Sequence, residues 1–120
     1  MFEFLSMLLK RTSIRDRRFP RVSIEAPAEL YFAERKYSIN GMVIEISQGG
    51  ALFREATRYI MDRRRALVVL RLAGQEFPGV IVNVRPNGYG ILFDAPVSED
   101  TIAEIGIAFQ DSRDEQSAAA

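Results

Sequence analysis

The chain has 120 residues, of which 48% are apolar and 27% are charged, and its acidic and basic residues balance to a net charge of zero. This composition is typical of one ordinary globular domain, and a neutral chain has no overall field that would attract nucleic acid. The sequence contains neither cysteine nor histidine. Disulfides, thiolate or histidine metal sites and serine–histidine catalysis are therefore excluded.

The charge is unevenly distributed. Between Lys10 and Arg21 there are six basic residues and one acid, whereas from Asp94 onward there are seven acids and one arginine. We expect residues 1–14 to form a flexible leader, because the apolar run at Met1–Leu9 is too short to span a bilayer. A surface anchor or a partner-binding helix is the alternative for this leader. Stable membrane insertion is not expected, and the missing cysteines suit a cytoplasmic protein.

Apolar and polar residues begin to alternate after Arg21. The period of two over 22–32 predicts a half-buried strand that is interrupted at Pro27. Asn40-Gly41 predicts a turn or bulge before a second strand, Met42–Ser47. In that second strand we expect Val43 and Ser47 to share one face with Glu45.

Further short strands follow at regular spacing. Gln48-Gly49-Gly50 indicates a break, Glu55–Arg65 is polar with a weakly indicated helical turn, and Pro86-Asn87-Gly88 predicts a hairpin. Short strands separated by glycine and proline favour a small antiparallel barrel or sandwich. The remaining strands are predicted at Ala51–Arg54, Ala66–Leu72, Phe77–Val84 and Tyr89–Phe93.

The pattern becomes helical after Pro96. Ser98 is a favourable N-cap, and acids follow it in the first turn. Ile102, Ile105 and Phe109 then recur at three- and four-residue steps, which predicts one apolar stripe that packs against the strands. Residues 111–120 are expected to be a disordered tail.

Nothing in the sequence indicates catalysis, since there is no phosphate-binding loop, dinucleotide-binding glycine motif or convincing carboxylate pair. The segment Arg17-Arg18-Phe19-Pro20-Arg21 indicates binding instead. Pro20 favours extended backbone, which places Arg17 and Arg21 on one side about 13 Å apart. Guanidinium groups at that distance can hold a phosphate or a guanine from both ends. By itself the segment could also be a solvated linker.

A carboxylate and a hydroxyl precede the double glycine Gly49-Gly50. Glu45 and Ser47 project together from the end of a predicted strand, immediately before Gly49 and Gly50. A carboxylate there can accept the donors of a guanine edge, and a glycine there can adopt positive φ or let a ligand approach the backbone. The same residues could equally form an ordinary strand end and its turn.

The two elements together resemble the PilZ domain family of cyclic-di-GMP receptors. The family's RxxxR motif matches Arg17 to Arg21, and its [D/N]xSxxG motif aligns on Glu45 to Gly50, with glutamate at the first position. The resemblance covers residues 15–110 and implies a mainly β fold, a small six-stranded antiparallel barrel with a C-terminal α-helix. It implies a non-enzymatic protein with neither cofactor nor metal, and cyclic-di-GMP as its ligand.

The resemblance also implies the ligand-binding residues. Arg17 and Arg21 would hold guanine and phosphate, Ser47 would add a polar contact, and Gly50 would allow close approach to the backbone. Glu45 keeps the acceptor but is one methylene longer than the family's Asp or Asn. The complete set expected to bind cyclic-di-GMP is Arg17, Arg18, Arg21, Glu45, Ser47, Gly49 and Gly50.

Three functions follow from these observations. The main hypothesis is a receptor whose basic segment becomes ordered on cyclic-di-GMP and then signals to a protein partner. The alternative is a degenerate domain that binds only protein in motility, pilus or secretion machinery. Binding of single-stranded nucleic acid is not expected, because Phe19 is the only aromatic residue in the arginine segment.

Overall fold

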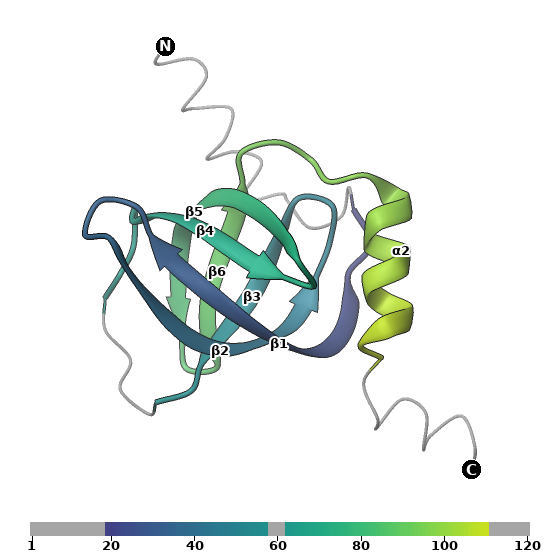
Figure 1. Ribbon diagram of the computed structural model, residues 1–120, viewed down its shortest axis with the longest axis horizontal. Helices are drawn as coiled ribbons and strands as arrows, with labels where there is room; N and C mark the ends of the chain where they lie inside the picture. Colours follow the sequence, from purple (N-terminus) through teal and green to yellow (C-terminus); the bar gives the residue numbers. More distant parts are fainter. Residues whose placement is uncertain (1–18, 58–61, 111–120) are drawn as a thin grey trace.

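The computed structural model describes residues 19–57 and 62–110 (Figure 1). The predicted leader, the predicted tail and two of the site residues, Arg17 and Arg18, lie outside this range. The described elements are β1 (Val22–Phe32), β2 (Tyr37–Ile46), β3 (Gly50–Glu55), β4 (Leu67–Leu72), β5 (Gln75–Arg85), β6 (Gly88–Phe93) and α2 (Glu99–Ala108).

The strands form one closed antiparallel barrel in the order β1-β2-β3-β6-β5-β4 (Figure 1). Sequential strands are neighbours except where β3 pairs with β6 and β4 closes the barrel against β1. Closure leaves the sheet with no free edge, which a short β domain otherwise has to protect. The predicted six-stranded barrel is confirmed, and the sandwich alternative is wrong.

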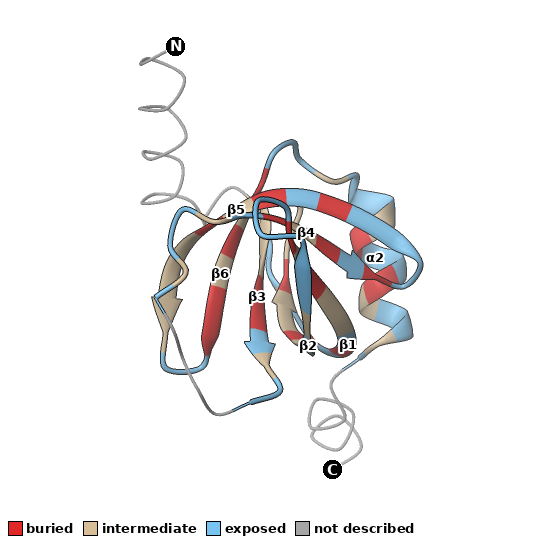
Figure 2. Ribbon diagram, turned by 60° about the vertical axis from the view of Figure 1, so that its left-hand side comes forward, coloured by how far each residue is buried: buried red, intermediate tan, exposed pale blue. Residues whose placement is uncertain are grey.

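Alternation along the strands builds the core inside the barrel. Leu30, Val43, Ile46, Phe53 and Ile81 are fully buried. Figure 2 shows the buried residues on the strands and on the side of α2 that faces the barrel. No charged or polar residue in the described part of the chain is buried as a whole, so the core is held by apolar packing.

The first turn does not lie where the sequence indicated. The chain reverses at residues 33–36, where Lys36 has φ 57°, and Asn40 and Gly41 lie inside β2. Gly41 pairs with Ala28, and a Cβ there would lie 2.2 Å from the Arg54 carbonyl oxygen. The glycine therefore serves close strand packing, which a turn signal in the sequence cannot distinguish.

Two irregularities change which face the side chains occupy. The β2–β3 register shifts between Val43 and Glu45, so Val43 is fully buried instead of sharing the face of Glu45. This prediction was wrong because a bulge breaks the period of two. Pro27 does not interrupt β1 but pairs with Met42, and the register shift in β1 lies earlier, between Ser23 and Ala26.

The predicted helix is confirmed. The Ser98 Oγ accepts a hydrogen bond from the backbone N–H of Thr101 at 3.1 Å, and Ile102 and Ile105 are buried. The end of α2 is tied to β1, where the Glu25 N–H donates to the Phe109 carbonyl oxygen at 3.0 Å. The helix thus covers the barrel beside the beginning of β1 (Figure 1).

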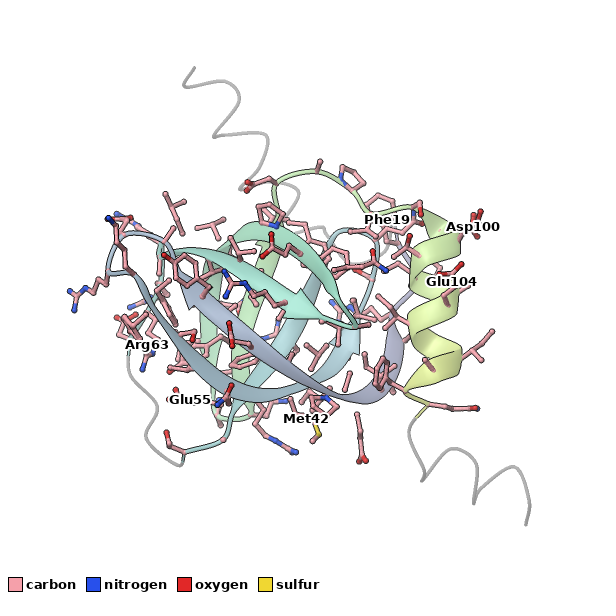
Figure 3. All side chains as sticks on the ribbon, viewed as in Figure 1. Phe19, Met42, Glu55, Arg63, Asp100 and Glu104 are labelled. Carbon is pink, nitrogen blue, oxygen red and sulfur yellow. The ribbon has the colours of Figure 1, made fainter. Side chains whose placement is uncertain are left out.

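An arginine closes the end of the barrel away from α2 (Figure 3). The Arg63 guanidinium carbon lies 4.9 Å from the centre of the Phe32 ring, and Nε donates to the Tyr89 hydroxyl at 3.1 Å. Its Nη2 lies 3.6 Å from Glu55 Oε1, and only 11% of each side chain is exposed. The helical turn that we considered for Glu55–Arg65 falls partly outside the described residues.

Candidate ligand-binding site

The first predicted motif and the second meet at an ion pair. Arg21 Nη1 lies 3.2 Å from Glu45 Oε1, and the two side chains are 37% and 34% exposed. The contact follows from the β1–β2 register, in which Ser23 pairs with Glu45. An ion pair this exposed contributes about 0–1 kcal/mol, so a ligand can displace it at little cost.

The turn after β2 is held by its own hydrogen bonds. The backbone N–H of Ser47 donates to the Gly50 carbonyl oxygen at 2.8 Å, and the N–H of Gly49 donates to Ser47 Oγ at 3.2 Å. The Ser47 hydroxyl therefore helps to hold the turn in shape.

The two glycines of the turn have different structural roles. Neither Gly49 nor Gly50 is among the described residues with positive φ. A Cβ on Gly50 would lie 2.2 Å from the Ile91 carbonyl oxygen, so Gly50 is needed for the pairing of β3 with β6. A Cβ on Gly49 would meet the Phe19 ring, 3.1 Å from Cδ2.

The contact between Phe19 and Gly49 was not foreseen from the sequence. It places the ring of the RxxxR segment directly on the turn of the second motif. Phe19 lies on the same side of the barrel as Asp100 at the beginning of α2 (Figure 3). Only two features of the sequence pointed to this packing, an aromatic residue, Phe19, in the first motif and a glycine, Gly49, in the second.

Gln48 adds a second contact that the sequence did not reveal. Its Nε2 donates to the Val97 carbonyl oxygen at 3.0 Å, and the Val97 N–H donates to the Gln48 carbonyl oxygen at 2.8 Å. Val97 directly precedes Ser98, the N-cap of α2. The turn is thus joined by two hydrogen bonds to the segment that starts the helix.

A shallow hollow of about 400 Å³ adjoins Arg21 on the side of α2. Its lining residues are Arg21, Val22, Ser23, Gly106, Ile107 and Gln110. In the described part of the chain no three acidic side chains gather in a way that could hold a metal ion. The groups that the described site residues offer are a guanidinium, a carboxylate and backbone N–H and C=O groups, which can bind a ligand by charge and hydrogen bonding.

The fold and these contacts define a small barrel with a polar site where β1 begins and β2 ends. The chain matches the PilZ domain family over residues 15–117, so it belongs to this family of cyclic-di-GMP receptor domains. The family is non-catalytic. No curated protein sequence matches the chain.

Solved structures agree with this fold. The PilZ domain with c-di-GMP of YcgR from Escherichia coli is 12% identical with a TM-score of 0.57, over 88% of this chain and 100% of that one. The PilZ domain of CeSA from a cellulose-synthesizing bacterium is 17% identical with a TM-score of 0.53, over 73% and 93%. At these identities the likeness concerns the fold.

No described helix is both long and apolar enough to cross a membrane. Of the seven predicted site residues, the structure brings Arg21 to Glu45 and places Ser47, Gly49 and Gly50 in the adjoining turn.

Proposed function

We propose that this protein is a cytoplasmic receptor for cyclic-di-GMP. The observation that carries the proposal is the meeting of the two motifs, with Arg21 3.2 Å from Glu45 and Phe19 packed on Gly49. This arrangement places a guanidinium beside a hydrogen-bond acceptor, which together match the Hoogsteen acceptors and the Watson–Crick donors of guanine.

Arg17 and Arg18 complete the site in this proposal. Phe19 packs on Gly49 in the turn of the second motif, and Arg17 and Arg18 directly precede Phe19 in the sequence. Arg17 binds a phosphate or guanine together with Arg21, and Arg18 adds positive charge. Ordering of this segment on the ligand then changes the surface that the N-terminal residues offer to a protein partner.

Titration calorimetry tests the proposal. Cyclic-di-GMP added to the full chain in low salt should release heat and saturate in the micromolar range. GTP serves as the control ligand, because it carries guanine and phosphates but lacks the cyclic diester. An absence of heat at tens of micromolar protein would overturn the proposal.

One observation favours a second candidate, a domain that binds only protein. The Glu45 carboxylate is longer than the Asp or Asn of the family motif and already has the Arg21 guanidinium as a partner. If the Arg21–Glu45 ion pair stays intact when the ligand is added, neither side chain is available to bind the ligand. In that case the wild-type chain shows no heat and the Glu45→Asp variant also shows none.

A further inference from the structure

The outer face of β1, β4 and the part of β5 that pairs with β4 carries apolar side chains that the described helix α2 does not cover. In Figure 1, β1 and β4 cross the front of the barrel, and α2 lies at its right-hand side. Along β4, Val68 and Leu70 are buried in the core. The alternate residues Leu67, Val69 and Arg71 therefore point outward. Leu67 is 51% exposed, although it lies within a strand of the barrel.

Cross-strand pairing arranges the outward side chains in rows that run around the barrel. One row consists of Tyr31, Val69 and Pro78, and the next row consists of Leu67 and Val80. All five side chains are exposed or half-buried, and together they form what we call the apolar strip. Contiguous apolar exposure of this kind, unlike single scattered residues, marks a surface for contact with another molecule.

An acidic row borders the apolar strip on one side. Glu29, Arg71 and Glu76 are cross-strand neighbours in this row. Arg71 Nη1 lies 2.6 Å from Glu29 Oε1, and Arg71 Nε lies 3.0 Å from Glu76 Oε2. The same guanidinium carbon lies 4.8 Å from the centre of the Tyr31 ring. The row therefore has two acids to one base, and its contacts hold it and the tyrosine ring in place, which lowers the entropy cost of binding a partner.

A basic row borders the apolar strip on the other side. The turn at residues 33–36 lies beside Leu67, whose carbonyl oxygen accepts a hydrogen bond from the Ala33 N–H at 3.1 Å. Arg65 lies beside β5, where its N–H donates to the Ile81 carbonyl oxygen at 2.7 Å. The basic row thus extends from the end of β1 to β5, parallel to the acidic row.

The side chains of the basic row are available to a partner. Arg35, Lys36 and Arg65 are exposed, and Glu34 is the acid in the same turn. Within the part of the chain that the structure describes, none of the three basic side chains forms an ion pair or a hydrogen bond. A partner that fits this face therefore carries acids opposite the basic row and bases opposite the acidic row.

The order of an acidic row, two apolar rows and a basic row is complementary to itself. A two-fold axis midway between the two apolar rows places the acidic row of each copy on the basic row of the other, and packs the two apolar rows together. We propose that this face binds a second copy of the chain. The inference is independent of the proposed function, because the ligand-binding site lies elsewhere, where β1 begins and β2 ends.

The two-fold arrangement also predicts which charges meet. Glu76 and Arg65 both lie at β5, so each meets the other on the partner subunit. Glu29 and Lys36 lie at β1 and its turn and meet in the same way. The four rows cover about 20 Å by 10 Å on each copy. This is at the low end of specific interfaces, so we expect a dissociation constant in the micromolar range.

Sedimentation velocity on the full chain tests the proposal in the absence of cyclic-di-GMP. Over a series from micromolar to hundreds of micromolar protein, the weight-average mass should rise from that of one chain to that of two. A chain that stays monomeric over the whole series would overturn the inference and leave the receptor function untouched. Growth beyond two copies would also overturn it, because a two-fold contact closes on itself.

A matched pair of variants locates the interface. Leu67→Ser removes an exposed leucine from the apolar strip and should weaken self-association roughly tenfold or more. Ile107→Ser is the control, because Ile107 is 79% exposed on α2 and lies outside the strip, and it should change the dissociation constant less than twofold. Thermal unfolding of both variants shows whether each remains folded. Equal self-association by the two folded variants would overturn the assignment of this face.

Reversal of the two charges at β5 gives an independent readout. Glu76→Lys and Arg65→Glu should each weaken self-association about threefold or more, because each brings like charges together twice in the dimer. An equimolar mixture of the two variants has opposite charges at both contacts and should associate within about twofold of the wild type. The loss of the Arg71 contact within one Glu76→Lys chain cannot be rescued in this way. A mixture that associates no more strongly than the separate variants would overturn the two-fold arrangement.

Discussion

Arg21 and Glu45 belong to motifs far apart in the sequence, yet their side chains lie 3.2 Å apart. The contact exists because β1 and β2 are antiparallel neighbours whose register places Ser23 opposite Glu45. Each residue thereby sets the position of the other before any ligand arrives. The consequences can be tested one residue at a time.

Removing either outer arginine of the first motif should abolish most of the affinity. Arg17→Ala and Arg21→Ala each remove a charged hydrogen bond, so calorimetry should show about a ten- to a hundredfold loss. Arg11→Ala is the control, since Arg11-Thr12-Ser13-Ile14-Arg15 repeats the spacing of the motif without its Phe-Pro. Equal losses in all three variants would show that only general charge matters.

Shortening Glu45 should strengthen binding. Glu45→Asp shortens the side chain by one methylene. The shorter carboxylate forms a weaker ion pair with Arg21 and has the side-chain length found in the family motif. We expect about a tenfold gain in affinity, the value of one recovered charged hydrogen bond. Glu34→Asp, in the exposed β1–β2 turn, is the matched control. Weaker binding by the Glu45→Asp variant than by the wild type would refute the length argument.

The two neighbouring glycines should respond differently to a methyl group. Gly50→Ala places Cβ against the Ile91 backbone, which cannot move without separating β3 from β6, so unfolding should become easier by about 1–3 kcal/mol. Gly49→Ala meets the Phe19 ring, which can shift. The unfolding free energy of the Gly49→Ala variant should change by about 0.5 kcal/mol or less, while its affinity for cyclic-di-GMP should fall about threefold or more.

Urea unfolding and calorimetry on both variants distinguish these outcomes. If Gly49→Ala binds as tightly as the wild type, the Phe19 contact has no part in holding the arginine segment. If Gly50→Ala is as stable as the wild type, β3 and β6 can shift to admit the methyl group and the prediction is contradicted.

Arg63 should matter for stability and leave binding unchanged. It contacts the rings of Phe32, Tyr37 and Tyr89 and pairs with Glu55, so Arg63→Ala leaves a largely buried carboxylate behind. We expect a loss of about 2–4 kcal/mol in urea unfolding. Arg63→Lys should recover only part of this loss, because an ammonium lacks the planar fork through which Arg63 donates to the Tyr37 and Tyr89 hydroxyls.

The neighbouring residue provides the control for that measurement. Arg64 pairs with Asp62, the two side chains are 61% and 62% exposed, and the arginine lowers the pKa of Asp62 to about 2. Arg64→Ala should leave the unfolding free energy almost unchanged. Equal destabilisation by the two alanine variants would mean that the aromatic contacts of Arg63 contribute nothing.

Local patterns in the sequence were sufficient for several features. Alternation over 22–32 predicted β1, Asn87-Gly88 predicted the last hairpin, and Ser98 predicted the start of α2. These features depend on neighbours along the chain, where the physical preference is encoded in a few consecutive residues. The Asn40-Gly41 turn failed because a glycine needed for strand packing looks the same as a glycine needed for a turn.

The sequence by itself determined the class of fold and the residue types of the site, since burial periodicity, turn residues and the two motifs are local. Only the tertiary structure decided which residues meet. The bulge that buries Val43 and leaves Glu45 half-exposed, and the packing of Phe19 on Gly49, depend on pairing between distant strands and segments. No short stretch of sequence contains that pairing, because it is selected by closure of the barrel around one shared core.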